Sequence, residues 1–129
     1  MDASRELTIT FGGREISLPI EYDCLSGEEI TKNQIDAVNW FASIADILEI
    51  SRDDVESYYN KTASYKGFIV SKDTIIIDDI IPQYIYVERG NPDCSIALMC
   101  RFKLDPEHGL AIVFSLDGKV SVGNQDIIL

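Results

Sequence analysis

The residues best suited to chemistry lie in one short segment that contains the chain's only histidine. Asp105, Glu107 and His108 fall within four positions, beside Pro106 and Gly109. A carboxylate next to an imidazole can shuttle a proton or bind a metal ion. Neighbouring side chains on a turn rarely converge, however, and a proline with a glycine is typical of a structural strand connection. We therefore expect no metal site and no cofactor here.

Motifs for covalent catalysis are missing from the sequence. It has no GxSxG, HExxH or Walker pattern. Cys24, Cys94 and Cys100 are odd in number and form no CxxC pair, which argues against a disulfide framework or a zinc site and favours a reducing cytoplasm. One of them could pair with His108 as a dyad. A small hydrolase or metal-dependent enzyme centred on Asp105, Glu107 and His108 stays an alternative hypothesis, but we expect no enzyme.

Charge is the clearest functional signal. The net charge is −11, and residues 21–56 hold ten acidic against two basic residues. Such a field repels nucleic acid and anionic lipid and attracts a basic protein. We therefore predict a basic protein partner and no binding to nucleic acid or membrane. The predicted partner-binding residues are Glu21, Tyr22, Asp23, Glu28, Glu29, Asp36 and Trp40.

Length and composition predict one domain spanning residues 1–129. With 46% hydrophobic residues, the chain can bury a core without metal or disulfide. Residues 1–6 carry charge and no apolar stretch, so we expect no secretory signal. The longest apolar runs, such as residues 75–77, are far shorter than the roughly 20 residues that span a bilayer.

The N-terminal half predicts a hairpin followed by two helices. Apolar and polar residues alternate on both sides of Gly12-Gly13, which suits a tight turn, and Pro19 indicates an edge or a bulge. Thr31 and Gln34 form a capping box that starts a helix over residues 31–49. That helix is apolar around more than half its circumference, so we expect the flank with Trp40 to be covered internally. A second helix is predicted over residues 52–61.

The C-terminal half predicts an antiparallel meander. We expect extended structure over residues 63–83, and then strands over 84–88, 95–103, 110–116 and 119–122 joined by turns at 90–93 and 117–118. Alternate residues from Ile96 to Phe102 and from Leu110 to Leu116 should face the helices. The last three residues, 127–129, should dock against the sheet. The predicted fold class is α+β: a twisted antiparallel sheet, built from the N-terminal hairpin and the C-terminal meander, with two helices packed on one face.

Several segments resemble a family of small bacterial proteins of unknown function. These are residues 96–100, 105–114 with their DPEHG start, and 123–129 with GNQDIIL, together with 18–22 and 26–29. The resemblance implies no catalytic residues. Proteins that look like this family are loosely associated with toxin–immunity settings. Our leading hypothesis is therefore a non-enzymatic acidic module, an immunity-type inhibitor of a basic bacterial toxin. A homo-oligomer built through the Trp40 flank and the outer sheet face is a third hypothesis.

Overall fold

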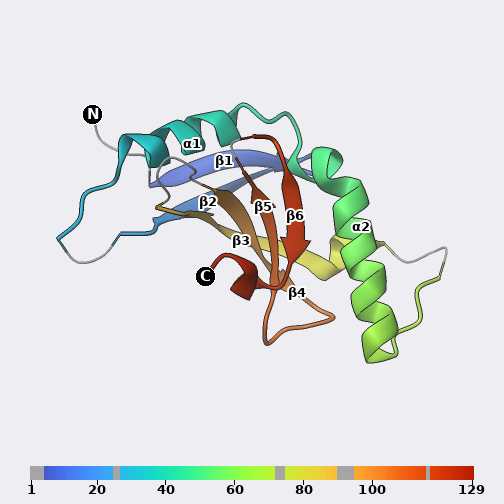
Figure 1. Cartoon of the computed structure of the whole chain (residues 1–129). Coiled ribbons are helices and arrows are strands. Elements are labelled where there is room, and N and C mark those ends of the chain that lie inside the picture. The colour runs from blue at the N-terminus through green and yellow to red at the C-terminus, as the bar shows by residue number, and fades with distance from the viewer. Residues whose placement is uncertain (1–4, 25–26, 72–74, 90–94, 116) are drawn as a thin grey trace.

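The computed structural model describes residues 5–24, 27–71, 75–89, 95–115 and 117–129. Over these residues the chain forms one six-stranded sheet and two α-helices (Figure 1), which confirms the predicted α+β fold class. The strands are β1 Glu6–Phe11, β2 Arg14–Tyr22, β3 Ile80–Val87, β4 Ile96–Phe102, β5 Leu110–Phe114 and β6 Val120–Gly123. The helices are α1 Lys32–Ala42 and α2 Ile47–Lys66, with short 3-10 turns η1 Ile76–Asp79 and η2 Gln125–Ile127.

The strands follow one another across the sheet in chain order. β1 and β2 form the predicted hairpin, in which Gly12 and Gly13 both adopt positive φ (61° and 81°). β3 to β6 form the predicted antiparallel meander. The β2–β3 pair is parallel because both helices intervene between these strands and return the chain to the same end of the sheet. β2 pairs with β3 only from Ile20 onward, so Pro19 lies just outside that ladder.

The prediction of one helix over 31–49 is wrong. α1 ends at Ala42, and α2 starts at Ile47 with Asp46 as its N-cap. The Asp46 carboxylate accepts hydrogen bonds from the backbone N–H groups of Gly12 (2.9 Å), Gly13 (2.8 Å) and Glu49 (3.2 Å). These hydrogen bonds to the hairpin turn stabilise the break between α1 and α2. The apolar pattern of the sequence continues across this break and therefore does not predict it. The predicted second helix, 52–61, is accordingly too short at both ends.

The prediction of extended structure over 63–83 is wrong for much of that segment. α2 continues to Lys66 and ends at Gly67 in the left-handed conformation (φ 78°), and residues 76–79 form η1. Asp79 holds η1 in place, because its carboxylate accepts the Tyr59 hydroxyl hydrogen bond (2.6 Å) and its carbonyl accepts from the Lys103 N–H (2.9 Å). Among the described residues of this segment, the strand begins at Ile80.

The main core lies between the helices and one face of the sheet. Figure 1 shows α1 across the top of the sheet and α2 down its right side. The core side chains of β4 and β5 alternate as predicted, and they are Ile96, Leu98, Cys100, Phe102, Leu110, Ile112 and Phe114. The Trp40 ring meets Phe114 edge-on at 6.0 Å, so the Trp40 flank, which we expected to be covered internally, is covered in part. Leu116, Cys94 and the predicted turn at 90–93 lie outside the described residues.

The opposite face of the sheet carries a smaller cluster of Ala97, Met99 and Ala111. Of the three C-terminal residues, only Ile128 packs against this cluster, while Ile127 and Leu129 are about half exposed or more (50% and 63%). Ile127 also meets the sheet, because its side chain lies against Gly123 of β6. The end of the chain is therefore docked through two of its three apolar residues, and Leu129 is the mostly exposed one.

Candidate functional site

The predicted partner-binding residues do not form one surface. Glu21 and Tyr22 are neighbours on β2, and alternation along a strand puts them on opposite faces of the sheet. Tyr22 packs partly against the main core, where burial raises the pKa of its hydroxyl. Glu21 is exposed on the other face. Tyr22 is therefore a supporting residue of the core rather than a free anchor for a partner.

A buried amide and one arginine anchor the acidic segment before α1. The Gln34 side chain is fully buried, and it donates to the carbonyl oxygens of Asp23 (3.1 Å) and Val87 (3.2 Å). Arg89 Nε pairs with Glu28 Oε2 at 3.1 Å, and its Nη1 donates to the Glu29 carbonyl at 2.6 Å. These contacts attach Glu28 and Glu29 to the ends of β2 and β3. Arg89 also neutralises part of the charge at Glu28.

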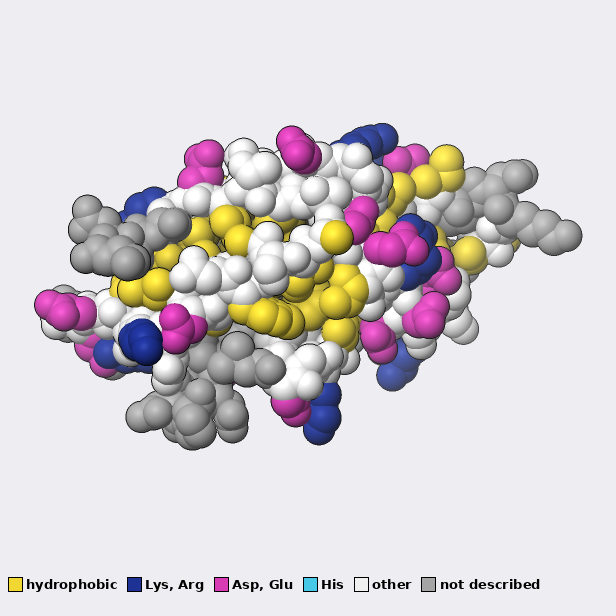
Figure 2. Space-filling view, turned by 90° about the horizontal axis from the view of Figure 1, so that it is seen from above, with side chains coloured by type: hydrophobic (Ala, Val, Ile, Leu, Met, Phe, Trp, Pro, Cys, Tyr) yellow, Lys and Arg dark blue, Asp and Glu magenta, His cyan; other side chains and the backbone are white. Residues whose placement is uncertain are grey.

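Asp36 and Trp40 belong to the helical side of the molecule. Asp36 is exposed on α1, while Trp40 is half-buried against the core. Figure 2 shows the molecule from above, with hydrophobic side chains gathered along the middle of this face and charged side chains, many of them acidic, around its edge. Trp40 is thus held by Phe114, and its exposed part contributes only an edge to any partner surface.

A group of tyrosines and carboxylates occupies the sheet face opposite the helices. Tyr84 and Tyr86 are half-buried and pack on the cluster of Ala97, Met99 and Ala111. Burial, followed by the charges of Asp23, Glu88 and Glu21, raises the pKa of Tyr86 to about 12. Burial and Glu21 also raise the pKa of Tyr84. We call this set, Glu21, Asp23, Tyr84, Tyr86 and Glu88, the tyrosine–carboxylate face.

The loop that contains His108 brings two of its three candidate residues, Asp105 and His108, into contact. The Asp105 carboxylate is buried and lies 3.1 Å from His108 Nδ1 and 3.5 Å from Lys66 Nζ. Burial opposes ionisation of Asp105, but the hydrogen bonds from the His108 side chain and backbone outweigh it and lower the pKa of Asp105. The hydrogen bond to Asp105 raises the pKa of His108 in turn.

The loop divides its side chains between two hollows. Asp105 and His108 line a groove of about 390 Å³ along α2, together with Lys61, Lys66 and Tyr65. Glu107 lines a different hollow of about 320 Å³ beside Arg101 and Gln125. In the part of the chain that the structure describes, no three His, Cys, Asp or Glu side chains are placed to share a metal ion. The arrangement orients one imidazole against the Asp105 carboxylate, while Glu107 lines the other hollow.

Cys100 offers no activated thiol. Cys100 is fully buried in the core, and burial raises the pKa of its thiol. The Cys24 thiol lies 3.8 Å from Gln34 Oε1 and 3.4 Å from Arg89 Nη1. A thiol with a raised pKa stays protonated at neutral pH and is a poor nucleophile.

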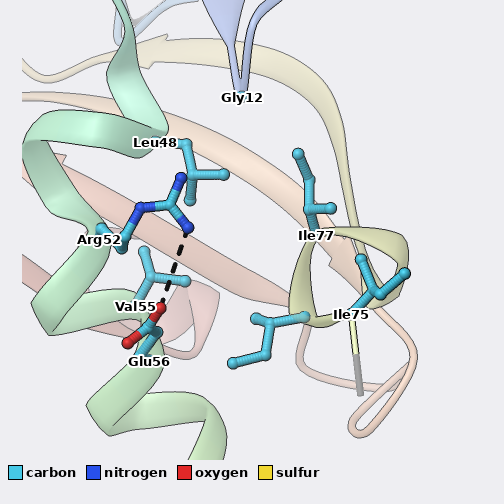
Figure 3. Close-up of a pocket in the computed structure, with 8 residues that line it drawn as sticks. Gly12, Leu48, Arg52, Val55, Glu56, Ile75 and Ile77 are labelled. Atoms are coloured by element: carbon cyan, nitrogen blue, oxygen red, sulfur yellow. Dashed lines mark ion pairs between the residues drawn. The ribbon is translucent and has the colours of Figure 1, made fainter. Parts of the chain in front are cut away.

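A hollow of about 380 Å³ lies where the β1–β2 turn, the first half of α2 and the chain before β3 meet (Figure 3). Leu48 and Val55 of α2 lie on one side of it, and Ile77 lies on the other. At its mouth, Arg52 Nη1 and Glu56 Oε1 form an ion pair at 3.9 Å. Sequence periodicity did not reveal this hollow, because its walls come from three separate segments.

Comparison with known proteins gives a family but no function. Residues 2–129 match a protein family described as "Domain of unknown function (DUF6985)". The chain belongs to this family. No curated protein and no solved structure matches the DUF6985 chain. No helix in its described residues has the length and apolar character needed to cross a bilayer.

Tyr84, Tyr86 and Glu88 of the DUF6985 chain were not among the residues predicted from its sequence. Their spacing of two places them on one face of β3 and its extension, opposite the buried Ile85 and Val87. That alternation was available from the sequence. Their position beside Glu21 and Asp23 was not, because it depends on the parallel pairing of β2 with β3.

Proposed function

We propose that this DUF6985 domain is a non-enzymatic protein-binding module that recognises a basic protein, and that it acts as an immunity-type inhibitor of a basic toxin. The tyrosine–carboxylate face carries the proposal. It combines half-buried aromatic rings with three carboxylates that lie close enough to raise the pKa of Tyr86. Tyrosine at a partly desolvated centre with a polar rim is typical of the residues that dominate protein–protein affinity.

The chemistry of the face favours a cationic partner. A lysine or arginine from the partner would stack on a tyrosine ring and pair with Glu21 or Asp23. Glu28 and Glu29, attached to the same end of the sheet, extend the negative field toward α1. In an immunity setting these carboxylates would occupy the cationic active site of the toxin, in place of the phosphates of a nucleic-acid substrate.

The rival hypothesis of an enzyme centred on Asp105, Glu107 and His108 has weaker support. Its three side chains line two separate hollows, and Asp105 is already engaged by His108 and Lys66. General acid–base chemistry needs both groups within reach of one substrate. Hydrolysis by the wild-type protein that His108→Asn abolishes would favour this rival over a binding module.

The test measures how charge reversal on this domain changes its affinity for the partner protein. The partner is first captured from the source cytoplasm, then purified, and its Kd is measured by calorimetry at several salt concentrations. Glu21→Lys with Asp23→Lys, and separately Glu28→Lys with Glu29→Lys, should each weaken binding at least tenfold, since like charges would replace favourable pairs. The matched control, Glu15→Lys with Glu107→Lys, changes the same charge at exposed positions elsewhere.

The outcomes are distinct. The proposal requires an affinity that falls with salt and with both test pairs but not with the control pair. An affinity that is insensitive to salt, or that the control pair weakens equally, contradicts it. The immunity role further requires that co-expression of the domain restores growth to cells that produce the partner, and that the test pairs abolish this rescue.

A further inference from the structure

The groove of about 390 Å³ that contains Asp105 and His108 is formed by the second half of α2 and the loop between β4 and β5 (Figure 1). We call it the α2 groove. Its α2 residues are spaced three and four positions apart, so they share one side of the helix. The described residues that line it are Tyr58, Lys61, Thr62, Tyr65, Lys66, Asp105, His108 and Asn124. Its volume is in the range of small-molecule sites.

Positive charge prevails inside the α2 groove, although the chain as a whole has a net charge of −11. The described lining residues include two lysines and His108 but a single carboxylate, that of Asp105. Asp105 is buried, and it already contacts His108 at 3.1 Å and Lys66 at 3.5 Å. Lys61 forms no ion pair with a carboxylate of the described residues. The charge of Lys61 is therefore not neutralised within the groove.

His108 provides a second donor, on the wall opposite Lys61. Its Nδ1 is held by the Asp105 carboxylate, which leaves Nε2 to interact with a ligand. The hydrogen bond to Asp105 and the charge of that carboxylate raise the pKa of His108, and the charges of Glu107 and Asp126 raise it further. A raised pKa favours the imidazolium form, in which Nε2 also carries a proton to donate. Lys61 and His108 thus offer an oxyanion one cationic donor from each wall.

Two tyrosines supply the aromatic part of the α2 groove. The Tyr58 ring is half-buried and packs against Phe102, with 6.0 Å between the ring centroids. Tyr65 is 89% exposed, so most of its ring is in contact with water. A flat ring placed on Tyr65 would remove apolar surface from water and gain a stacking interaction. Aromatic surface and cationic donors therefore line one groove.

These features together select the class of ligand. A neutral ring would use neither cationic donor, and a bare inorganic anion would leave the Tyr65 ring exposed. A long polyanion would extend beyond the groove into the negative field of the surrounding surface. We propose that the α2 groove binds a small aromatic molecule with one carboxylate or phosphate group, which pairs with Lys61 and His108 while the ring stacks on Tyr65. The site shares no residue with the tyrosine–carboxylate face, so it is independent of the proposed function.

The first test follows the ring signals of His108 by NMR of the full chain at constant pH. Because the chain has one histidine, these signals need no further assignment. The probes are benzoate, phenyl phosphate, inorganic phosphate and benzyl alcohol. We expect benzoate or phenyl phosphate to shift the signals saturably, and the tighter of the two identifies the preferred oxyanion. Benzyl alcohol or inorganic phosphate binding as tightly as that probe, or no saturable shift with either aromatic anion, overturns the inference.

The second test uses variants and the tighter aromatic probe. Lys61→Met keeps the apolar stem but removes the charge, and it should weaken binding about tenfold. Tyr65→Ala removes the stacking ring and should weaken binding about fivefold. Lys32→Met is the matched control, because Lys32 is an exposed lysine on α1 that does not line the groove.

All three substituted positions are exposed, and circular dichroism checks that each variant keeps its fold. The inference requires that Lys61→Met and Tyr65→Ala weaken binding while Lys32→Met does not. Equal weakening by Lys61→Met and Lys32→Met would mean that the probe responds only to the overall charge, and this overturns the inference. An unchanged Kd in Tyr65→Ala overturns it as well, because the ring would then not stack on the ligand.

Discussion

Asp46 should be the most consequential single acidic residue for stability, because one carboxylate serves two elements. Its Oδ1 accepts from the Gly12 N–H and caps α2 through the Glu49 N–H, while its Oδ2 accepts from the Gly13 N–H. The hairpin turn and the start of α2 are more than thirty residues apart in sequence. We predict that Asp46→Ala separates them without removing any core side chain.

The magnitude follows from the three hydrogen bonds. Loss of the N-cap costs about 1 kcal/mol. The Gly12 N–H is partly buried, so losing its charged acceptor costs about 1.5 kcal/mol, and the exposed Gly13 N–H adds about 0.5 kcal/mol because water replaces its partner. The total is about 3 kcal/mol, which corresponds to a fall in Tm of about 10 °C for a domain of this size. Asp46→Asn keeps a capping oxygen and should lose about 1 kcal/mol.

The assay is chemical denaturation followed by circular dichroism, with the m-value compared between variants. Asp36→Ala is the control, because it removes an exposed carboxylate from α1 and should change the free energy of unfolding by less than about 0.5 kcal/mol. A cost below about 1 kcal/mol for Asp46→Ala, with an unchanged m-value, would refute the argument that this carboxylate joins the turn to the helix.

The same interaction predicts a dependence on pH. Burial opposes ionisation of Asp46, but the backbone hydrogen bonds from Gly12, Gly13 and Glu49 outweigh it and lower its pKa. A carboxyl group with a lowered folded-state pKa stabilises the protein above its unfolded value of about 3.9, and that stabilisation is lost as the pH falls through the folded value. The difference between wild type and Asp46→Asn should therefore shrink in acid. If the difference in free energy of unfolding between the wild type and Asp46→Asn stays constant as the pH falls, the lowered pKa of Asp46 is contradicted.

Three further predictions concern the residues that hold the candidate surfaces in place. Gln34→Met should cost about 1–2 kcal/mol in denaturant unfolding, because it removes one donor from the Asp23 carbonyl and one from the Val87 carbonyl, which keeps the Asp23 N–H; an unchanged free energy of unfolding would mean that water replaces the amide. Tyr59→Phe should cost about 1 kcal/mol at neutral pH, since the hydroxyl, whose pKa is raised to about 12, donates to Asp79; an unchanged free energy of unfolding would count against that bond. Asp105 raises the pKa of His108, so the stability that this pair contributes is present below the unfolded histidine pKa and lost as the pH rises through the folded value; NMR titration of His108 in the wild type and in Asp105→Asn should show a lower histidine pKa in the variant, and an unchanged histidine pKa would contradict it.

Local patterns in the sequence determined much of the fold. Alternation along residues 96–102 and 110–114 identified which side chains face the helices, and two glycines identified the first hairpin. The Thr31–Gln34 capping box was also correct, with Gln34 accepting from the Thr31 N–H at 2.9 Å. These features are encoded within a few residues of one another, where steric preference and the periodicity of strands and helices act directly. The excess of acidic residues was likewise evident without a structure.

Contacts between distant segments decided the rest. The break between α1 and α2 depends on Asp46 reaching the glycine turn, and the tyrosine–carboxylate face depends on β2 pairing with β3 across both helices. The same holds for the separation of Glu107 from Asp105 and for the hollow between Leu48 and Ile77. The residue types around each of these features were also compatible with other local structures and other pairings of the strands. The packing of the whole chain selected the observed structure, because these contacts become favourable only after the core has brought their partners together.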